Sequence, residues 1–184
     1  MTLTMLGAAD VATREKEDFA CRAPRAEDGE KVWSLVASCP PLDRNSLYCN
    51  LLQCTHFSDT CVLAEKGGRA LGWVSAYRPP AEPETLFIWQ VAVHDDARGA
   101  GLARLMIEQL LARPSARGVT RLRTTITPDN EASWALFKSV AKALDAPFSS
   151  AEWLEKEAHF GDRHEPEHLV TIGPFETRPP AHRL

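Results

Sequence analysis

The loop Arg98-Gly-Ala-Gly-Leu-Ala103 is the segment whose residue types and spacing most directly indicate chemistry. It follows an apolar run over 87–93, which indicates a buried strand, and opens an amphipathic segment that predicts a helix over 101–113. Glycines let the backbone approach a phosphate closely, and the first amides of a helix have no acceptor within that helix. The helix dipole adds about half a positive charge at the same end. We therefore expect this loop to bind a pyrophosphate without a side-chain cation.

Two better-known phosphate loops do not fit this segment. The sequence has no G-x-x-x-x-G-K-[ST] motif, and the G-x-G-x-x-G pattern that starts at Gly99 is incomplete because Arg104 stands at the third glycine position. The spacing of Arg98, Gly101 and Ala103 instead resembles the acyl-CoA pyrophosphate loop of the GCN5-related N-acetyltransferases (GNAT). The resemblance implies that acetyl-CoA binds here and that backbone amides of the preceding strand polarise its carbonyl. The residues implied in cofactor binding are Val91, Val93, Arg98, Gly99, Ala100, Gly101, Leu102 and Ala103.

A second motif lies on a predicted helix over 130–142. Asn130-x-x-Ser133-x-x-x-Phe137 matches the GNAT pattern N-x-x-[AS]-x-x-x-[YF]. The resemblance implies that Asn130 hydrogen-bonds the pantetheine arm, that Ser133 belongs to the cofactor site, and that Phe137 lies near the thioester sulfur. A capped core helix would explain Asn130 and Phe137 equally well. The joint occurrence of both motifs at the family's spacing favours cofactor binding.

Phe137 departs from the usual family pattern. Many GNAT members have a tyrosine at this position, whose phenol protonates the departing CoA thiolate, and phenylalanine has no proton to give. A thiol has a pKa of about 8.5, so the thiolate can leave unaided or with help from water. Tyr48, or another hydroxyl from a different direction, is the other candidate acid.

Further segments resemble a narrower family, the L-2,4-diaminobutyrate acetyltransferases of ectoine biosynthesis. The patterns LD-x-NS-x-Y, WQVAV and TT-x-TP-x-N occur in this order and at fitting separations. The resemblance implies acetyl transfer to the γ-amine of L-2,4-diaminobutyrate by a homodimer, with N4-acetyl-L-2,4-diaminobutyrate as the product used for ectoine, a compatible solute. The segments that carry it are 42–48, 51–57, 89–93, 124–130 and 161–168.

Side chains in these segments suit a short diamine that carries one carboxylate. Carboxylates at Asp43 and Glu167 can hold its two nitrogens, and the indole of Trp89 can wall its methylenes. His164 can orient the substrate or relay a proton, and the general base stays open among Asp43, His164 and Glu167. Asp43 could instead be only a helix cap, and Trp89 could be plain core. The candidate cations for the substrate carboxylate are Arg44, Arg78 and Arg163.

His164-Glu-Pro-Glu-His168 contains the letters of a zinc-hydrolase motif, H-E-x-x-H. That motif needs both histidines one turn apart on a helix, with the glutamate acting on metal-bound water. Pro166 would interrupt such a helix, and the short stretch after His168 offers no third ligand. We therefore expect no metal site.

The elements that must position these residues follow the order β-α-α-β-β-β-α-β-α-β. This order predicts an α/β fold with a mixed, largely antiparallel twisted sheet flanked by helices, and it matches the GNAT arrangement. We expect a flexible N-terminal tail over 1–17, one acetyltransferase domain over 18–173 and a C-terminal tail over 174–184. The expected strands lie at 19–23, 60–65, 70–77, 86–93, 121–126 and 168–172, and the expected helices at 28–36, 47–54, 101–113 and 130–142.

The composition predicts a single soluble domain. The 184 residues are 44% hydrophobic and 25% charged, and the net charge of −4 argues against a general nucleic-acid-binding surface. No apolar run is long enough to span a membrane, and no basic and then apolar leader is evident, so we expect a cytoplasmic protein without a membrane partner. Five irregularly spaced cysteines indicate reduced thiols rather than disulfides or a zinc site.

Two other functions remain open from the sequence. The chain could acetylate another small amine or a protein N-terminus, or it could be a non-catalytic acyl-CoA-binding sensor, for which the missing tyrosine is the only indication. The outer segments favour the diamine substrate, because a sensor would need no amine pocket. Acetyl-CoA is the only cofactor that we expect.

Overall fold

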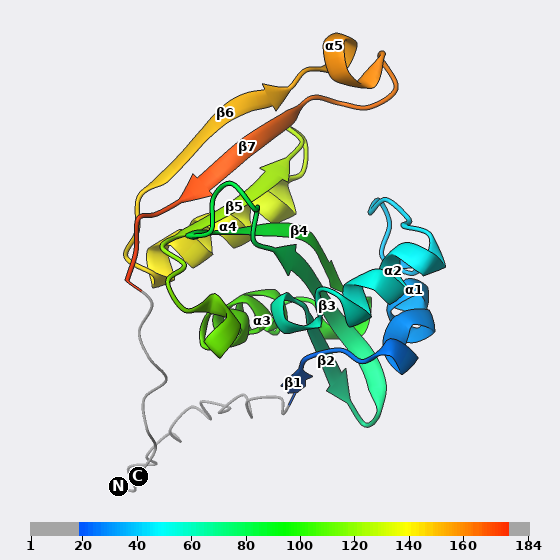
Figure 1. Cartoon of the computed structure of the whole chain (residues 1–184). Helices are drawn as coiled ribbons and strands as arrows, with labels where there is room; N and C mark the ends of the chain where they lie inside the picture. Colours follow the sequence, from blue (N-terminus) through cyan, green and yellow to red (C-terminus); the bar gives the residue numbers. More distant parts are fainter. Residues whose placement is uncertain (1–18, 177–184) are drawn as a thin grey trace, which may run out of the picture.

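Residues 19–176, the part of the chain that the computed structural model describes, form one seven-stranded mixed sheet with helices on both faces (Figure 1). The strands are β1 (Ala20–Arg22), β2 (Val62–Lys66), β3 (Arg69–Tyr77), β4 (Thr85–Val93), β5 (Arg121–Ile126), β6 (Phe148–Leu154) and β7 (Glu167–Ile172). The helices are α1 (Gly29–Ala37), α2 (Leu47–Thr55), α3 (Leu102–Leu111), α4 (Glu131–Ala143) and α5 (Lys156–Phe160). The strand order is β1-β2-β3-β4-β5-β7-β6, and every neighbouring pair is antiparallel except β4 and β5. The predicted mixed, largely antiparallel α/β fold is confirmed.

Two pairs of helices cover the sheet. The larger apolar core lies under α3 and α4 and includes Met106, Ile107 and Val140, whereas the smaller core lies under α1 and α2 around Val32 and Trp73. Because β4 and β5 are parallel, their carboxyl ends lie at the same edge of the sheet, and the chain enters α3 and α4 from that edge. The first turns of both helices, which carry the two predicted cofactor motifs, are therefore brought to one side of the molecule.

The hairpin of β6 and β7, with α5 at its tip, corrects the expected element list (Figure 1). Neither β6 nor α5 was predicted. β6 is the edge strand, and its five central residues are all exposed, so its sequence has no apolar alternation to indicate a strand. α5 spans only five residues and is too short to show a helical period.

The C-terminal boundary of the domain also differs from the expected one at residue 173. Phe175 is buried in the core, and its amide donates to the Thr120 carbonyl (2.9 Å), so the folded unit includes at least Phe175. The expected N-terminal tail over 1–17, and the expected C-terminal tail beyond Glu176, lie outside the described residues. Within the described part, no helix is long and apolar enough to cross a membrane.

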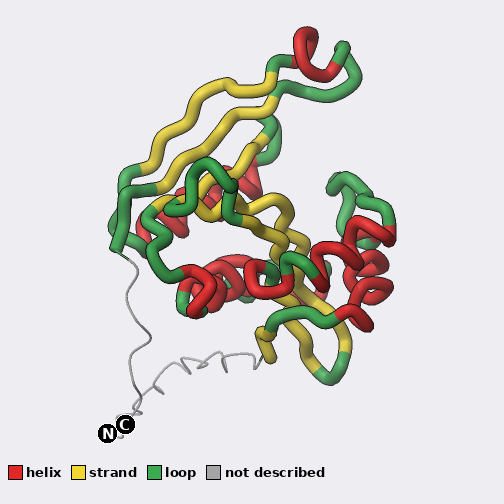
Figure 2. Tube along the Cα trace, viewed as in Figure 1, coloured by secondary structure: helices red, strands yellow, loops and turns green. Residues whose placement is uncertain are grey.

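β4 and β5 separate after a short stretch of pairing (Figure 2). Only residues 85–87 of β4 pair with residues 121–123 of β5. Beyond this point β4 stays paired to β3 as far as Val93, while β5 stays paired to β7 as far as Ile126. Over residues 88–93, β4 therefore has one edge that no other described strand pairs with, in the middle of the sheet. Backbone amides on such an edge need another partner, such as water or a ligand.

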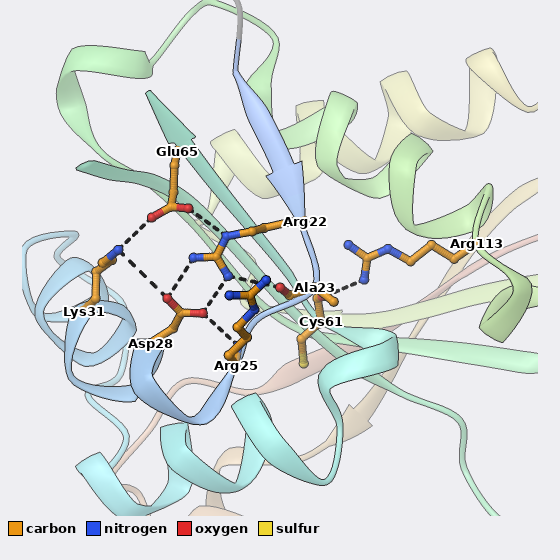
Figure 3. Close-up of polar contacts among 8 residues, drawn as sticks. All are labelled: Arg22, Ala23, Arg25, Asp28, Lys31, Cys61, Glu65 and Arg113. Atoms are coloured by element: carbon orange, nitrogen blue, oxygen red, sulfur yellow. Dashed lines mark hydrogen bonds and ion pairs between the residues drawn. The ribbon is translucent and has the colours of Figure 1, made fainter. Parts of the chain in front are cut away.

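An ionic cluster joins β1, α1 and β2 (Figure 3). Arg22 donates to both carboxylate oxygens of Asp28 (2.6 and 2.8 Å) and to Glu65 (2.8 Å), and Lys31 also donates to Glu65 (2.7 Å). The hydrogen bonds from Arg22 lower the pKa of the buried Asp28 carboxyl despite the opposing effect of burial, and the amide of Arg25 lowers it further. The cluster fixes the start of α1 against the sheet through fully paired charges.

Asp28→Asn should lower the free energy of unfolding at pH 7 by about 2 kcal/mol, because the charged hydrogen bonds from Arg22 are lost. The pKa of Asp28 is lowered in the folded state, so its stabilisation is complete well above the ordinary value of about 3.9 and is lost as the pH falls through the lowered value. Denaturant unfolding of wild type and variant across this pH range measures the effect.

Glu108→Gln is the control, because it removes only an exposed ion pair with Arg104 (3.3 Å). It should change the free energy of unfolding by less than about 0.5 kcal/mol. A deficit in Asp28→Asn that stays constant towards acidic pH would contradict the stabilising role of the ionised carboxylate.

Candidate active site

The predicted pyrophosphate loop connects a 3₁₀ turn (Asp95–Ala97) to the first turn of α3. Gly99 and Gly101 have φ angles of 76° and 77°, and the space where a Cβ would stand is open at both. Among the described residues, none of the amides from Gly99 to Arg104 makes a backbone hydrogen bond of good geometry, and the first that does is that of Leu105, which donates to the Gly101 carbonyl (3.0 Å). Left-handed glycines followed by free amides at a helix start form a concave site for an anion.

The arginine that opens the motif is engaged elsewhere. The Nη2 atom of Arg98 lies 3.0 Å from a carboxylate oxygen of Asp95, and both side chains are mostly exposed. With Arg98 paired in this way, the loop presents backbone amides and the end of the helix dipole, which are the groups that the sequence expects to bind a pyrophosphate.

A β-bulge at Trp89 shapes the next part of the site. In the pairing of β3 with β4, Ser75 lies opposite Gln90 and Ala76 lies opposite Ile88, so Trp89 is an extra residue without a partner. A bulge of this kind turns two successive side chains towards similar directions and bends the strand.

The bulge decides which β4 side chains meet each helix layer. Ile88 before it, and Val91 and Val93 after it, all pack on the core under α3 and α4. Val91 and Val93 can therefore meet a cofactor only through their backbones, at the open edge of β4. Trp89 is 49% exposed and its ring stands edge-on to Tyr77 (centroids 6.5 Å apart), so it is not plain core.

The second cofactor motif lies at the start of α4. The side-chain oxygen of Asn130 accepts the Ser133 amide (3.1 Å) and caps the helix, and its side-chain nitrogen has no hydrogen-bond partner among the described residues. That nitrogen is a free donor at the same edge as the pyrophosphate loop. Phe137 is 3% exposed and belongs to the main core. Asn130 therefore caps the helix and Phe137 packs in the core, which are the structural roles that the sequence left open. Asn130 also keeps one side-chain donor for a ligand.

Glu167, at the start of β7, combines burial with an unsatisfied oxygen. Its Oε2 atom is buried and accepts no hydrogen bond of good geometry from residues 19–176, although the Thr125 hydroxyl lies close to the carboxylate, and its Oε1 atom lies 3.9 Å from Nε2 of His164. Burial raises the pKa of Glu167, the nearby Asp43 charge raises it further, and Thr125 and His164 act in the opposite direction. Asp43, from a distant segment of the chain, therefore lies within electrostatic range of Glu167.

His164 lies in the loop before β7 and is held in a defined orientation. Its ring packs on Phe160 (centroids 4.8 Å apart), and its Nδ1 atom lies 2.6 Å from the carbonyl oxygen of Glu165. A carbonyl only accepts, so Nδ1 carries the proton in the neutral ring and Nε2 is the basic nitrogen. The basic nitrogen faces Glu167.

Two further predicted residues come from the segment that leads into α2. Asp43 is exposed in the loop before the helix, and Tyr48 is 68% exposed on its first turn. Neither side chain has a hydrogen bond or ion pair within the described residues. These groups, with Trp89, are available to a ligand and are not used to hold the fold together.

The structure distinguishes among the three arginines that are candidates to bind a substrate carboxylate. Arg78 donates to the carbonyl oxygens of Pro83, Ser115 and Arg117 and so ties the loop between β3 and β4 to the segment between α3 and β5. It is not free to bind a substrate, and this candidate was wrong. Arg44 and Arg163 are exposed and remain candidates.

Sequence reasoning missed Gln90 and the point at which β4 parts from β5. Gln90 is 8% exposed, and its amide bonds the loop that carries Asp43. The indication of Gln90 in the sequence was its position as a polar residue inside an apolar strand. The family resemblance implied that backbone amides of this strand meet the cofactor, but the point at which β4 parts from β5 had no indication in the sequence, because strand pairing depends on partners distant along the chain.

The zinc-hydrolase reading of the H-E-x-x-H letters fails on geometry. His164 lies in a loop and His168 on β7, where its ring meets Trp134 (centroids 6.1 Å apart), so the two histidines do not share a helix. Among residues 19–176, no group of three or more metal-ligating side chains is assembled. All five cysteines are free thiols, and Cys39, Cys54 and Cys61 are buried.

Comparison with known proteins agrees with this geometry. Residues 29–141 match the model of the acetyltransferase (GNAT) family. The L-2,4-diaminobutyric acid acetyltransferase of Methylotuvimicrobium alcaliphilum is 54% identical over 153 residues, which cover 83% of this chain and 89% of that protein. The enzyme of the same name from Chromohalobacter salexigens is 49% identical over 162 residues, which cover 88% of this chain and 84% of that protein.

A solved structure gives the same result. The diaminobutyrate acetyltransferase EctA from Paenibacillus lautus, in complex with its substrate L-2,4-diaminobutyric acid and coenzyme A, superposes with a TM-score of 0.83 at 40% identity, covering 88% of this chain and 98% of that one. The chain therefore belongs to the acetyltransferase (GNAT) family and, within it, to the L-2,4-diaminobutyric acid acetyltransferases.

Proposed function

We propose that the chain transfers the acetyl group of acetyl-CoA to the γ-amino group of L-2,4-diaminobutyrate and so makes N4-acetyl-L-2,4-diaminobutyrate for ectoine synthesis. The observation that carries the proposal is the buried Oε2 atom of Glu167, which accepts no hydrogen bond from the described residues and lies within electrostatic range of the unpaired Asp43 carboxylate. The proposal is supported by sequence identities of 54% and 40% to two proteins that are named diaminobutyrate acetyltransferases.

The acceptor site fits a short diamine. Glu167 has a buried oxygen without a partner, and Asp43 has a free carboxylate, so each can accept hydrogen bonds from one nitrogen of the substrate. The exposed face of Trp89 can cover the two methylenes between them and attract the ammonium group. Arg44 or Arg163 supplies the cation for the substrate carboxylate.

The cofactor site fits acetyl-CoA. The free amides of residues 99–104 bind the pyrophosphate, and the unpaired edge of β4 over 88–93 offers hydrogen-bond groups to the amides of the pantetheine arm. The free side-chain nitrogen of Asn130 adds a donor from α4. The acetyl group then lies between the cofactor edge and the amine site, next to Trp89.

The reaction is a direct attack of the neutral γ-amine on the thioester carbonyl carbon. An aliphatic ammonium has a pKa near 10, so removing its proton at pH 7 costs about 4 kcal/mol, and the neighbouring α-ammonium reduces this cost. Glu167 is a fitting proton acceptor because its pKa is raised, and the basic nitrogen of His164 can pass the proton on. Amides at the open edge of β4 stabilise the oxyanion, the C–S bond breaks, and the CoA thiolate takes up a proton.

Homodimer formation and a cytoplasmic location are also part of the proposal. The edge strand β6 supports association, because one of its edges has no strand partner among residues 19–176 and Trp153 on it is 49% exposed. The five free thiols support a reducing compartment.

Gly101→Asp should raise the KM for acetyl-CoA by about 100-fold, because the new carboxylate projects from the loop into the space assigned to the pyrophosphate. Gly101→Ala is the control for the left-handed backbone and should raise this KM much less. Calorimetry with CoA checks both variants. Binding of CoA to Gly101→Asp with wild-type affinity would show that the pyrophosphate lies elsewhere.

Phe137→Leu should leave the shape of the pH–rate profile unchanged, since residue 137 is a core residue without a proton to donate. Tyr48→Phe should remove an ionisation on the alkaline limb if its phenol protonates the thiolate. The measurement is kcat against pH with saturating substrates. An unchanged profile in both variants would leave water as the donor, and a changed profile in Phe137→Leu alone would contradict the packing role.

Asp43→Ala and Glu167→Ala should each lower kcat/KM for diaminobutyrate by about 100-fold, or roughly 3 kcal/mol, with CoA binding intact. The acidic limb of the profile should move to lower pH in Glu167→Gln, because the pKa of Glu167 is raised in the wild type. Ornithine, with one more methylene, should be a poor acceptor. Equal turnover of diaminobutyrate, ornithine and lysine, or a product acetylated at the α-nitrogen by NMR, would overturn the proposal in favour of a general amine acetyltransferase.

A further inference from the structure

Gln90 is a buried carboxamide that joins two parts of the proposed amine site. It follows the bulged Trp89 on β4 and is 8% exposed. Its Nε2 atom donates to the Asp43 carbonyl (2.9 Å), and its Oε1 atom accepts from the Asn45 side chain (3.3 Å). One side chain of the sheet therefore holds the loop at two positions, on either side of Arg44.

The loop over 40–46 has few other polar anchors. Its described backbone bonds within the loop are limited to the Leu42 amide, which donates to the Cys39 carbonyl (3.1 Å), and Ser46 is used as the cap of α2. Asp43 has no secondary structure of its own and no side-chain hydrogen bond. The position of its carboxylate therefore depends on how firmly its backbone is held to the sheet.

The chemistry at position 90 is specific. The Asp43 carbonyl can only accept and the Asn45 amide nitrogen can only donate, so the anchor needs a donor and an acceptor on one side chain. A carboxamide provides both. A carboxylate would turn an oxygen towards the Asp43 carbonyl, and an apolar side chain of the same length would leave both loop groups unpaired. The two hydrogen bonds of Gln90 therefore explain why a polar side chain occupies this buried position, which packing alone does not explain.

We infer that Gln90 is a positioning residue for the amine substrate: it fixes the loop so that the Asp43 carboxylate meets one nitrogen of the diamine beside Trp89. The inference rests on the proposed function, in which Asp43 holds an ammonium group. Gln90 does not contact the reacting atoms. It acts through the Asp43 backbone, and the bulge at Trp89 is what turns both Trp89 and Gln90 towards this site.

The test uses the full chain with diaminobutyrate and acetyl-CoA as substrates. Gln90→Met should raise the KM for diaminobutyrate by about tenfold and change the KM for acetyl-CoA by less than about twofold. Adding Gln90→Met to Asp43→Ala should lower kcat/KM by less than about twofold beyond Asp43→Ala alone, because the anchor has no carboxylate left to position. Asn45→Ala, which removes one of the two bonds, should have a smaller effect of the same kind.

Two variants separate positioning from simple loss of stability. Gln53→Met is the matched control, since Gln53 is also a buried amide with a hydrogen bond from Asn50 (2.9 Å), but it lies within α2 and does not touch the loop. It should lower the melting temperature without a selective rise in the KM for diaminobutyrate. Gln90→Glu should behave like Gln90→Met, because it keeps the size and loses the donor.

The other outcomes of these measurements decide whether Gln90 positions the Asp43 loop. Three results would overturn the positioning role of Gln90. The first is an unchanged KM for diaminobutyrate in Gln90→Met and Asn45→Ala, and the second is an equal rise in the KM values for diaminobutyrate and acetyl-CoA. The third is a double variant in which the effects of Gln90→Met and Asp43→Ala on kcat/KM multiply fully. If Gln90→Met does not fold, Asn45→Ala and Gln90→Glu give the same decision. A normal KM in Asp43→Ala would overturn the proposed role of Asp43 and this inference with it, whereas a raised KM in Asp43→Ala alone would overturn only the inference.

Discussion

The separation of β4 from β5 is the constraint on which the rest of the structure depends. Two parallel strands pair over three residues and then part, so β4 keeps an unpaired edge in the interior of the sheet. Unpaired backbone groups away from water are costly, which makes this edge a place for a ligand that carries its own amides. Because both strands lead directly into helices, the same separation sets the distance between the start of α3 and the start of α4.

The bulge at Trp89 adapts the strand to this separation. It adds one residue opposite β3, which changes the phase of β4 between Ile88 and Val91 while both still pack on the same core. β4 can therefore keep a continuous apolar face towards α3. It also turns the indole of Trp89 and the carboxamide of Gln90 towards the proposed amine site. The position of the loop before α2 follows from the hydrogen bonds of that carboxamide.

The charges of the protein are divided between stability and function. Around Asp28 the carboxylates and cations are satisfied by one another, and the pKa of Asp28 is lowered. Around Glu167 the carboxylate has an unpaired buried oxygen, and its pKa is raised. An unsatisfied buried carboxylate oxygen lowers the stability of the folded chain, so its presence within electrostatic range of Asp43 is best explained by a cationic substrate.

The sequence by itself determined the elements with strong local patterns: the apolar strand over 87–93, the glycine loop, and the helices that begin near residues 101 and 130. It also determined the chemistry of the side chains, so Asp43, Trp89, His164 and Glu167 could be named. β6 escaped prediction because an exposed edge strand has no apolar alternation. Only the tertiary structure decided that β4 and β5 part after residue 87, that Asp43 lies within electrostatic range of Glu167, and that Gln90 hydrogen-bonds the loop that carries Asp43. These features depend on contacts between residues far apart in the chain, which no local pattern of polar and apolar residues can encode.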